Sequence, residues 1–418
     1  MMGDTNLIRK LFLEALGESL KGGRVQWDME LTMQDWNELF SLAHVHHVLP
    51  MIFEAVYACP AAKMVDPRLM MAARRQTMQN VMMQAVKTSE SLALIRHLRE
   101  AGLTPCVVKG IVCRNLYPNP DHRMSSDEDL LIPPMQAERC HEAMTTFGMQ
   151  MSDSQVDRTT AYEVPYGKPG SPIYIELHKS LFPPKNEAYG DLNRFFEDVH
   201  EHTVEMELGG VMIATLCPTD HFFYLICHSF KHFLHSGFGL RQVCDIVLFA
   251  NRYGAQIDWE KVKDNCEQIH ALQFMRALLK IGLVYFGFDA KAAHLPADWH
   301  IESVDEAPML EDLMDSGVYG DATMSRKHSS TMTIQAVTAD KQGKKGKRSL
   351  LRTLLPKRES LVGRYPYLQN KPYLLPLAWA SRIWGYVRRS SKQNDNTAES
   401  LRIASERIEL MRKYGIIR

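Results

Sequence analysis

The chain has 418 residues, of which 45% are hydrophobic and 23% are charged, and its 49 basic side chains balance its 49 acidic ones. These values are ordinary for a globular protein with a large buried core, and the length predicts two or three domains. A net charge of zero excludes a global field that attracts nucleic acid or an anionic membrane, so a polynucleotide partner would need a local basic patch.

The eight cysteines are scattered, and no close pair has the spacing of a zinc knuckle. Several lie inside apolar runs, which predicts reduced, buried thiols in a cytoplasmic protein. Residues 1–20 place acidic side chains within an apolar stretch and therefore predict an amphipathic helix, not a signal peptide. No apolar run approaches the roughly 20 residues of a spanning helix, so we expect no integral membrane segment.

Hydrophobic periodicity divides the chain into regions of different character. Apolar residues recur at three- and four-residue spacing near the N-terminus and again after Pro218, which predicts helices. Alternation with period two is concentrated between these regions and predicts strands. A polar stretch with a terminal basic run follows, and it lacks sustained periodicity. The expected regions are helices at 1–101, an α/β core at 102–216, a helical domain at 217–319, a mobile linker or loop at 320–348, and a C-terminal helical region at 349–418 that ends in an amphipathic helix near Glu399–Lys413.

The first motif runs from Val107 to Pro134 and reads VVKGIVCRNLYPNPDHRMSSDEDLLIPP. It combines an apolar strand, a Lys-Gly pair, a short helix, a loop with an arginine, and an acidic pair that enters a second strand. If residues 127–132 are extended, Asp127 and Asp129 share one face of the sheet, and Glu128 lies on the other. Adjacent carboxylates repel each other unless a cation lies between them, and Mg²⁺ takes such ligands together with phosphates. The pair by itself is more typical of a solvated strand start.

A third carboxylate lies in the segment Ile173–Phe182, which reads IYIELHKSLF. Its first half alternates between an apolar face and a face that carries Glu176 and His178, which predicts a half-buried strand. A helical pattern at Met135–Phe147 separates this strand from the acidic pair, so we expect Glu176 beside both aspartates on a shared sheet. Three carboxylates around one or two Mg²⁺ ions can support phosphoryl or nucleotidyl transfer. His178 either orients Glu176, contacts substrate, or is an ordinary outward-facing polar residue.

These motifs resemble a known family. The pattern KG…LYP…R…SDEDLLI followed by IELHKSLF is similar to bacterial nucleotidyltransferases of the polymerase-β-like superfamily, specifically the uncharacterised nucleotidyltransferases. The similarity extends into HSFKHFLHSGFGLRQVCDIVLF and YPYLQNKPYLLPLAWASRIW, and it covers most of the chain from about Glu90 onward. It implies an α+β fold in which a small mixed-sheet nucleotidyltransferase core is embedded in a mostly helical chain.

The resemblance also implies a reaction and a site. The reaction would move a nucleoside monophosphate from an NTP to an acceptor hydroxyl and release pyrophosphate, with Mg²⁺ or alternatively Mn²⁺ as cofactor. The acceptor stays open between a small molecule, a protein and RNA. Lys109 is expected to face the nucleotide phosphates near a helix N-terminus, with Gly110 allowing close backbone approach. The expected site comprises the catalytic and metal-binding residues Asp127, Asp129 and Glu176 and the nucleotide-binding residues Lys109, Gly110, Arg123 and His178.

Three positions depart from the family pattern. Ile111 follows Gly110 where the superfamily has a serine, so a serine contact to phosphate is missing. Glu128 replaces an apolar residue between the two aspartates, and Glu176 stands where Asp is common. The first two departures, Ile111 after Gly110 and the acidic Glu128, favour an alternative, a degenerate, non-catalytic nucleotide-binding or interaction module of the same fold. A further alternative, by analogy within the superfamily, is a toxin-like enzyme that modifies tRNA or a protein.

A histidine-rich stretch after Pro218 has helical spacing and contains His221, His228, His232 and His235. No Glu is placed as in HExxH, and no Cys or acid follows at a telling interval, so a zinc site is the minority interpretation. We expect these histidines to line the nucleotide cleft or to pack within the helical domain. Arg241 and Asp245 are four residues apart, which suits either an intrahelical ion pair or a substrate contact.

Overall fold

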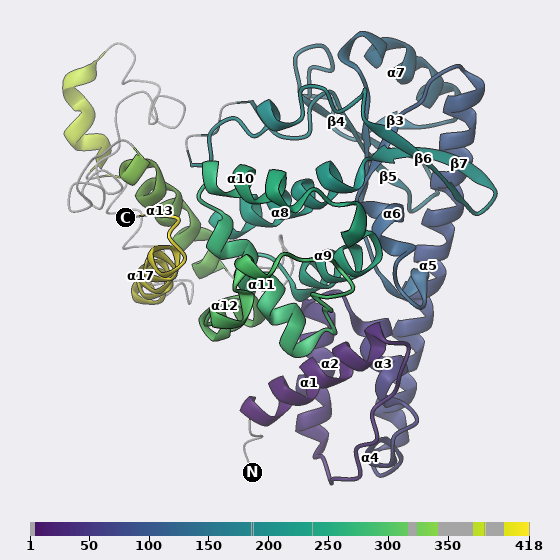
Figure 1. Ribbon diagram of the computed structural model, residues 1–418, viewed down its shortest axis with the longest axis vertical. Helices are drawn as coiled ribbons and strands as arrows, with labels where there is room; N and C mark the ends of the chain where they lie inside the picture. The colour runs from purple at the N-terminus through teal and green to yellow at the C-terminus, as the bar shows by residue number, and fades with distance from the viewer. Residues whose placement is uncertain are drawn as a thin grey trace.

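The computed structural model describes residues 5–316 except 185, 187 and 236, and also residues 324–341, 371–379, 381 and 397–417. Figure 1 shows a twisted sheet at one end of the molecule, with helices packed beside and below it. The arrangement is an α+β fold with a mixed sheet inside a mostly helical chain, which confirms the predicted fold class.

The N-terminal region is helical, as its hydrophobic spacing predicts. Thr32 and Asp35 begin the second helix with a reciprocal pair of side chain–backbone hydrogen bonds. Asp66 caps the fifth helix, whose first residue is Pro67. This 34-residue helix is about 50 Å long and extends from the N-terminal helices to the sheet (Figure 1). The helices are α1 (Thr5–Leu20), α2 (Met33–Val45), α3 (Leu49–Val56), α4 (Pro60–Lys63) and α5 (Pro67–Glu100).

The sheet has the strand order β3-β4-β5-β2-β1-β7-β6. The pairs β1–β7 and β2–β5 are parallel, and the other neighbouring pairs are antiparallel. Strands β2 and β1 lie in the middle of the sheet, and every residue in them is buried. The strands are β1 (Cys106–Val108), β2 (Glu128–Leu131), β3 (Gln150–Met151), β4 (Glu163–Gly167), β5 (Tyr174–His178), β6 (Thr203–Leu208) and β7 (Val211–Leu216).

Alternation along the strands gives the sheet two different faces. On one face, Leu130 and Ile175 pack with apolar residues of α5 and of helix α7 (Ala137–Thr146) in one buried cluster. On the other face, Asp129 and Glu176 lie side by side, because they are register partners in the parallel strands β2 and β5. The strand that the sequence predicts around Glu176 is thus confirmed, with its acidic residue on the face opposite the apolar cluster.

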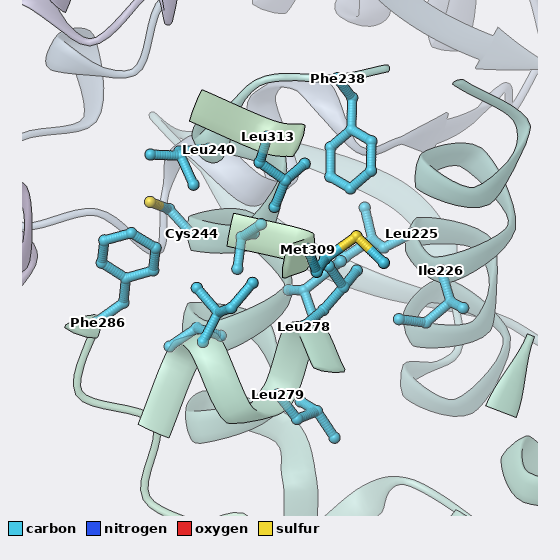
Figure 2. Close-up of a cluster of buried hydrophobic side chains, with 14 of the residues drawn as sticks. Leu225, Ile226, Phe238, Leu240, Cys244, Leu278, Leu279, Phe286, Met309 and Leu313 are labelled. Atoms are coloured by element: carbon cyan, nitrogen blue, oxygen red, sulfur yellow. The ribbon is translucent and has the colours of Figure 1, made fainter. Parts of the chain in front are cut away.

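The helices that follow β7 form a second layer. Tyr224 of this layer directs its hydroxyl toward Asp129 at 3.5 Å, so the layer covers the acidic face of the sheet. Residues of α1, α2 and α3 belong to the same buried cluster as this layer. Figure 2 shows the centre of the cluster, with side chains that include Leu225, Ile226, Leu240, Cys244, Leu278, Leu279, Met309 and Leu313. The helices are α6 (Gly110–Arg114), which follows β1, and α8 (Pro218–Leu234), α9 (Leu240–Tyr253), α10 (Trp259–Gln268), α11 (Leu272–Tyr285) and α12 (Ala307–Ser316).

Two further expectations concern the cysteines and membrane-spanning helices. All eight cysteines are free, and seven of them are buried, as their apolar surroundings predict. Among the described residues, no helix combines the length and apolar character needed to cross a membrane.

The segment 320–348 is the clearest correction to the sequence analysis. A loop was predicted there, but residues Met324–Lys341 form helix α13, which packs against α8 and against α17 (Thr397–Lys413). Ser329, Thr333 and Val337 are fully buried on this helix, so two polar residues take part in its packing face and conceal the helical period. The basic run at 342–348 and, in the predicted C-terminal region, residues 349–370, 380, 382–396 and 418 lie outside the described residues. Helix α17 confirms the predicted terminal amphipathic helix.

Arg407 of α17 ties the C-terminal helix to α8. Its buried guanidinium donates to the carbonyl oxygens of Phe233 and His235 (2.6 Å to His235) at the end of α8, and to Asp312 of α12 at 3.2 Å. We predict that Arg407→Met lowers the free energy of unfolding by about 3 kcal/mol, because it leaves two carbonyls at the end of α8 without this donor and removes one of the two arginines that pair with buried Asp312. Denaturant unfolding measures this change.

The matched control is Arg402→Met, on the same helix. Arg402 pairs with Glu406, and both side chains are 58% exposed. This substitution should change the free energy of unfolding by less than about 0.5 kcal/mol. Equal losses from the two variants would contradict the anchoring role of Arg407.

Candidate active site

Lys109 lies at the end of β1 in an unusual backbone conformation. Its φ is +49°, a region that residues with a side chain rarely adopt and that costs energy unless neighbouring groups hold it. Its N–H donates to Nε2 of His221 at 3.0 Å, and Nδ1 of His221 lies 3.3 Å from the hydroxyl of Thr215. Burial lowers the pKa of His221 to about 3, so the ring is neutral and can accept this hydrogen bond. His221 therefore fixes the backbone of Lys109, a role that its helical spacing could not indicate.

The side chain of Lys109 joins the two aspartates. Its Nζ lies 2.7 Å from Oδ2 of Asp129, 3.7 Å from Oδ2 of Asp127, and 3.3 Å from Nε2 of His228. Burial disfavours the ammonium, but the charges of Asp127 and Asp129 outweigh burial and raise the pKa of Lys109 well above its usual value. Lys109 thus remains positively charged within reach of both carboxylates.

Asp129, Glu176 and His178 form a compact group of candidate metal ligands. One ligand atom from each residue lies within 4.8 Å of the others. Nε2 of His178 is 3.4 Å from Oδ1 of Asp129 and 3.6 Å from Oε2 of Glu176. The structure therefore brings together two of the three predicted carboxylates and adds His178, which the sequence analysis assigned to nucleotide binding. Asp127 lies outside this group and connects to Asp129 through Lys109.

The members of the group shift one another's pKa. Burial favours neutral Asp129, but Lys109 and His178 outweigh burial and hold the pKa of Asp129 well below its usual value. Burial raises the pKa of Glu176, and the charges of Asp129 and Asp127 raise it further. Burial also disfavours charged His178, but the carboxylates of Asp129 and Glu176 outweigh burial and raise its pKa to about 9. Positively charged Lys109 and His178 thus offset the crowded carboxylates.

The chemistry of the group fits a divalent cation. Within the described residues, Oδ1 of Asp129 and Nε2 of His178 are buried and make no hydrogen bond, so an ion could bind between them, with His178 as a ligand once it has lost its proton. Carboxylate oxygens suit Mg²⁺ and Mn²⁺, whereas an imidazole nitrogen favours a transition metal. Two carboxylates with one imidazole therefore fit Mn²⁺ at least as well as Mg²⁺.

Glu128 explains two of the departures from the family pattern. Its Oε2 accepts from the N–H of Ile111 at 2.7 Å, and its other oxygen pairs with buried Arg114 of α6. A Cβ at Gly110 would lie 1.9 Å from Oε2 of Glu128, so only glycine leaves room for this carboxylate. The N–H of Ile111 therefore already donates to Glu128. This amide lies close to the position at which the sequence predicts a phosphate of the nucleotide.

Arg123 is also engaged by the protein. Its guanidinium makes two hydrogen bonds of 2.7 Å to Asp245 of α9, and Tyr117 donates to the same carboxylate at 2.7 Å. Arg123 is 2% exposed, so the pair holds the loop before β2 against α9. The predicted intrahelical ion pair between Arg241 and Asp245 is wrong, because Asp245 makes its ion pair with Arg123 across the two elements.

A polar cavity of about 110 Å³ lies between α6, α8 and α9. His228 and His232 of α8 line it, whereas His221 and His235 do not. Nε2 of His228 and Nε2 of His232 are 3.2 Å apart. The lining residues are Lys109, Gly110, Arg123, Ser125, Ser126, Asp127, Leu225, His228, Ser229, His232, Arg241, Gln242 and Asp245.

Comparison with known protein families gives a match over the central part of the chain. A model of the family described as uncharacterised nucleotidyltransferase matches residues 32–286, which is more than half of the chain. The match includes the strands that carry Asp129 and Glu176 as well as helices α8 and α9. No curated protein and no solved structure matches the chain significantly. The chain therefore belongs to the uncharacterised nucleotidyltransferase family and is a nucleotidyltransferase.

Proposed function

We propose that the protein transfers a nucleoside monophosphate from an NTP to an acceptor hydroxyl, with release of pyrophosphate, in a reaction that depends on a divalent cation. The observation that carries this proposal is the pairing of Asp129 and Glu176 on adjacent strands, with His178 between their oxygens. Membership of the nucleotidyltransferase family supports the reaction class. The cation and the direction of transfer follow from the chemistry of the site.

Each residue of the site has a distinct part in this reaction. Asp129, Glu176 and His178 hold the cation, and Asp127 supplies a further carboxylate next to Lys109. A divalent cation bound there would stabilise the charge on the transferred phosphate and on the leaving pyrophosphate. Glu176 lies beside Asp129 on the adjacent strand, where it completes the metal site or takes the proton of the acceptor hydroxyl. Lys109 is positively charged and positioned to offset the charge of the triphosphate.

The structure does not add support for a non-catalytic module. Ile111 after Gly110 and the acidic Glu128 were the sequence features that favoured it. In the structure these positions complement one another, because Glu128 caps α6 and requires Gly110. The two departures are therefore consistent with a rearranged start of α6, and the carboxylates of the opposite sheet face are retained.

Label transfer tests the proposed reaction. The protein is incubated with cell lysate, Mg²⁺ or Mn²⁺, and each NTP labelled at either the α- or the γ-phosphate. We expect an acceptor fraction to gain the α label and never the γ label, because the bond that breaks joins the α-phosphorus to the oxygen of the pyrophosphate. Acceptors that gain the γ label would contradict nucleotidyl transfer, as would the absence of any transfer with all four NTPs.

Substitution of Asp129 tests the site. Asp129→Asn keeps the shape of the side chain but removes the negative charge. Lys109 and His178 contact that charge in the structure, and the proposed metal ion would bind to it. We expect the affinity for Mn²⁺, measured by calorimetry, to fall at least about a hundredfold, since even residues that only support metal ligands contribute 10–100-fold. Glu207→Gln, on the exposed side of β6, is the control and should leave the affinity unchanged. Equal affinities for Asp129→Asn and the wild type would place the cation elsewhere.

Nucleotide binding is measured by thermal unfolding. A ligand that binds the native state at a concentration of 100 times its Kd stabilises that state by about 2.7 kcal/mol. We therefore expect an NTP with Mn²⁺ to raise the Tm by several degrees, and Lys109→Met to reduce the part of the shift that depends on the NTP. An NTP-dependent shift of the same size in Lys109→Met would remove Lys109 from the nucleotide site.

A further inference from the structure

The cavity between α6, α8 and α9 has more positive groups than its carboxylates can offset. Asp245 pairs with Arg123 and accepts from Tyr117, and Asp127 lies 3.7 Å from Nζ of Lys109. Arg241 makes no ion pair with any carboxylate among the residues that the structure describes. An arginine that lines a cavity and feels the charges of Asp245 and Asp127 without contacting either carboxylate is suited to bind an anionic ligand.

Unsatisfied nitrogen atoms support this interpretation. Nε of Arg241 and Nη1 of Arg123 are both buried, and neither has a hydrogen-bond partner in the described part of the chain. Burial and the charge of Arg123 lower the pKa of Arg241, so the two guanidinium groups repel each other. A bound anion would supply acceptors to these nitrogen atoms and would offset that repulsion.

The histidines of α8 complete the lining as neutral groups. Burial lowers the pKa of both His228 and His232 well below the usual value, and the neighbouring ammonium of Lys109 lowers each of them further. Each neutral ring has one N–H to donate. Nε2 of His228 lies near both Lys109 and His232, so the pair connects the cavity to the ammonium that contacts Asp129.

The size of the cavity limits what it can hold. Pockets for whole drug-sized ligands occupy about 300–1,000 Å³, and a water molecule occupies about 30 Å³ of the liquid. A cavity of about 110 Å³ therefore has room for one or two phosphate groups and not for a complete nucleotide. The base and ribose must lie outside it, so this cavity does not distinguish one base from another.

We propose that this cavity binds the β- and γ-phosphates of the nucleotide, with Arg241 as their main ligand and with His228 and His232 as neutral hydrogen-bond donors. The assignment rests on the proposed nucleotidyl transfer. It replaces Arg123, whose charge Asp245 already offsets, with Arg241 as the guanidinium that contacts phosphate. The assignment also gives His228 and His232 a role. Their spacing on α8 is required neither for zinc binding nor for packing.

The position of the cavity favours the nucleotide over the acceptor as its ligand. Lys109 and Asp127 line the cavity, whereas Asp129, Glu176 and His178 do not. When the α-phosphorus accepts the acceptor oxygen, the acceptor proton passes to Glu176. The electron pair of the broken bond stays on the pyrophosphate, which remains in the cavity between Lys109 and Arg241. Acceptor and leaving group thus lie on opposite sides of the transferred phosphate, as in-line displacement requires.

Binding of inorganic tripolyphosphate tests the proposal without a nucleoside. Calorimetry in the presence of EDTA compares tripolyphosphate and adenosine with the full-length wild type. We expect tripolyphosphate to bind and adenosine not to bind. Arg241→Gln should weaken tripolyphosphate binding roughly ten- to hundredfold, the range of a hydrogen bond to a charged group. Arg252→Gln, on the same helix but exposed, should change the affinity less than twofold.

A second variant tests the histidines, and the outcomes separate this proposal from the proposed reaction. His232→Asn should weaken tripolyphosphate binding severalfold, with circular dichroism showing an intact fold. Failure of the wild type to bind tripolyphosphate, unchanged binding in Arg241→Gln, or an equal loss in Arg252→Gln would overturn the cavity assignment even if label transfer occurs. Binding that depends on Arg241 in a protein that transfers no label would retain the cavity and reject the reaction.

Discussion

The repulsion between carboxylates on one face of the sheet is the constraint around which the site is built. The parallel register of β2 and β5 places Asp129 directly beside Glu176, and Asp127 immediately precedes β2. Such a cluster is costly in a buried place unless cations compensate it. Lys109 and His178 supply that compensation in the structure, and each contacts Asp129 through a different oxygen. A site arranged in this way can exchange part of its internal positive charge for a metal ion.

The surrounding contacts hold these charges in place. His221 fixes the strained backbone at Lys109, and the ion pair between Arg123 and Asp245 holds the loop that leads into β2. Glu128 and Arg114 perform a similar function on the opposite face, where they fix the start of α6. Residues that look like ligands in the sequence therefore divide into two groups. One group faces the cavity and the metal ligands, and the other forms buried ion pairs that position the first.

Much of the site could be predicted because strands have a period of two. Alternation alone placed Asp129 and Glu176 on one sheet face and correctly separated Glu128 from them. Pairings between distant elements could not be predicted in this way. The partner of Asp245 depends on how α9 packs against the loop before β2, and nothing in the spacing of Arg241 indicates that Arg123 is closer. Helix α13 was missed for a related reason, since Thr333 and Val337 become a packing face only beside α8 and α17.

The central claim is that Asp129, Glu176 and His178 bind one divalent cation. Pulsed electron paramagnetic resonance of bound Mn²⁺ tests it most directly, because the method detects nitrogen nuclei coordinated to the ion. The account predicts a ¹⁴N coupling from one imidazole in the wild type, and its loss in His178→Asn. Bound Mn²⁺ without nitrogen coupling in the wild type, or with the same coupling in His178→Asn, would contradict this assignment of the metal ligands.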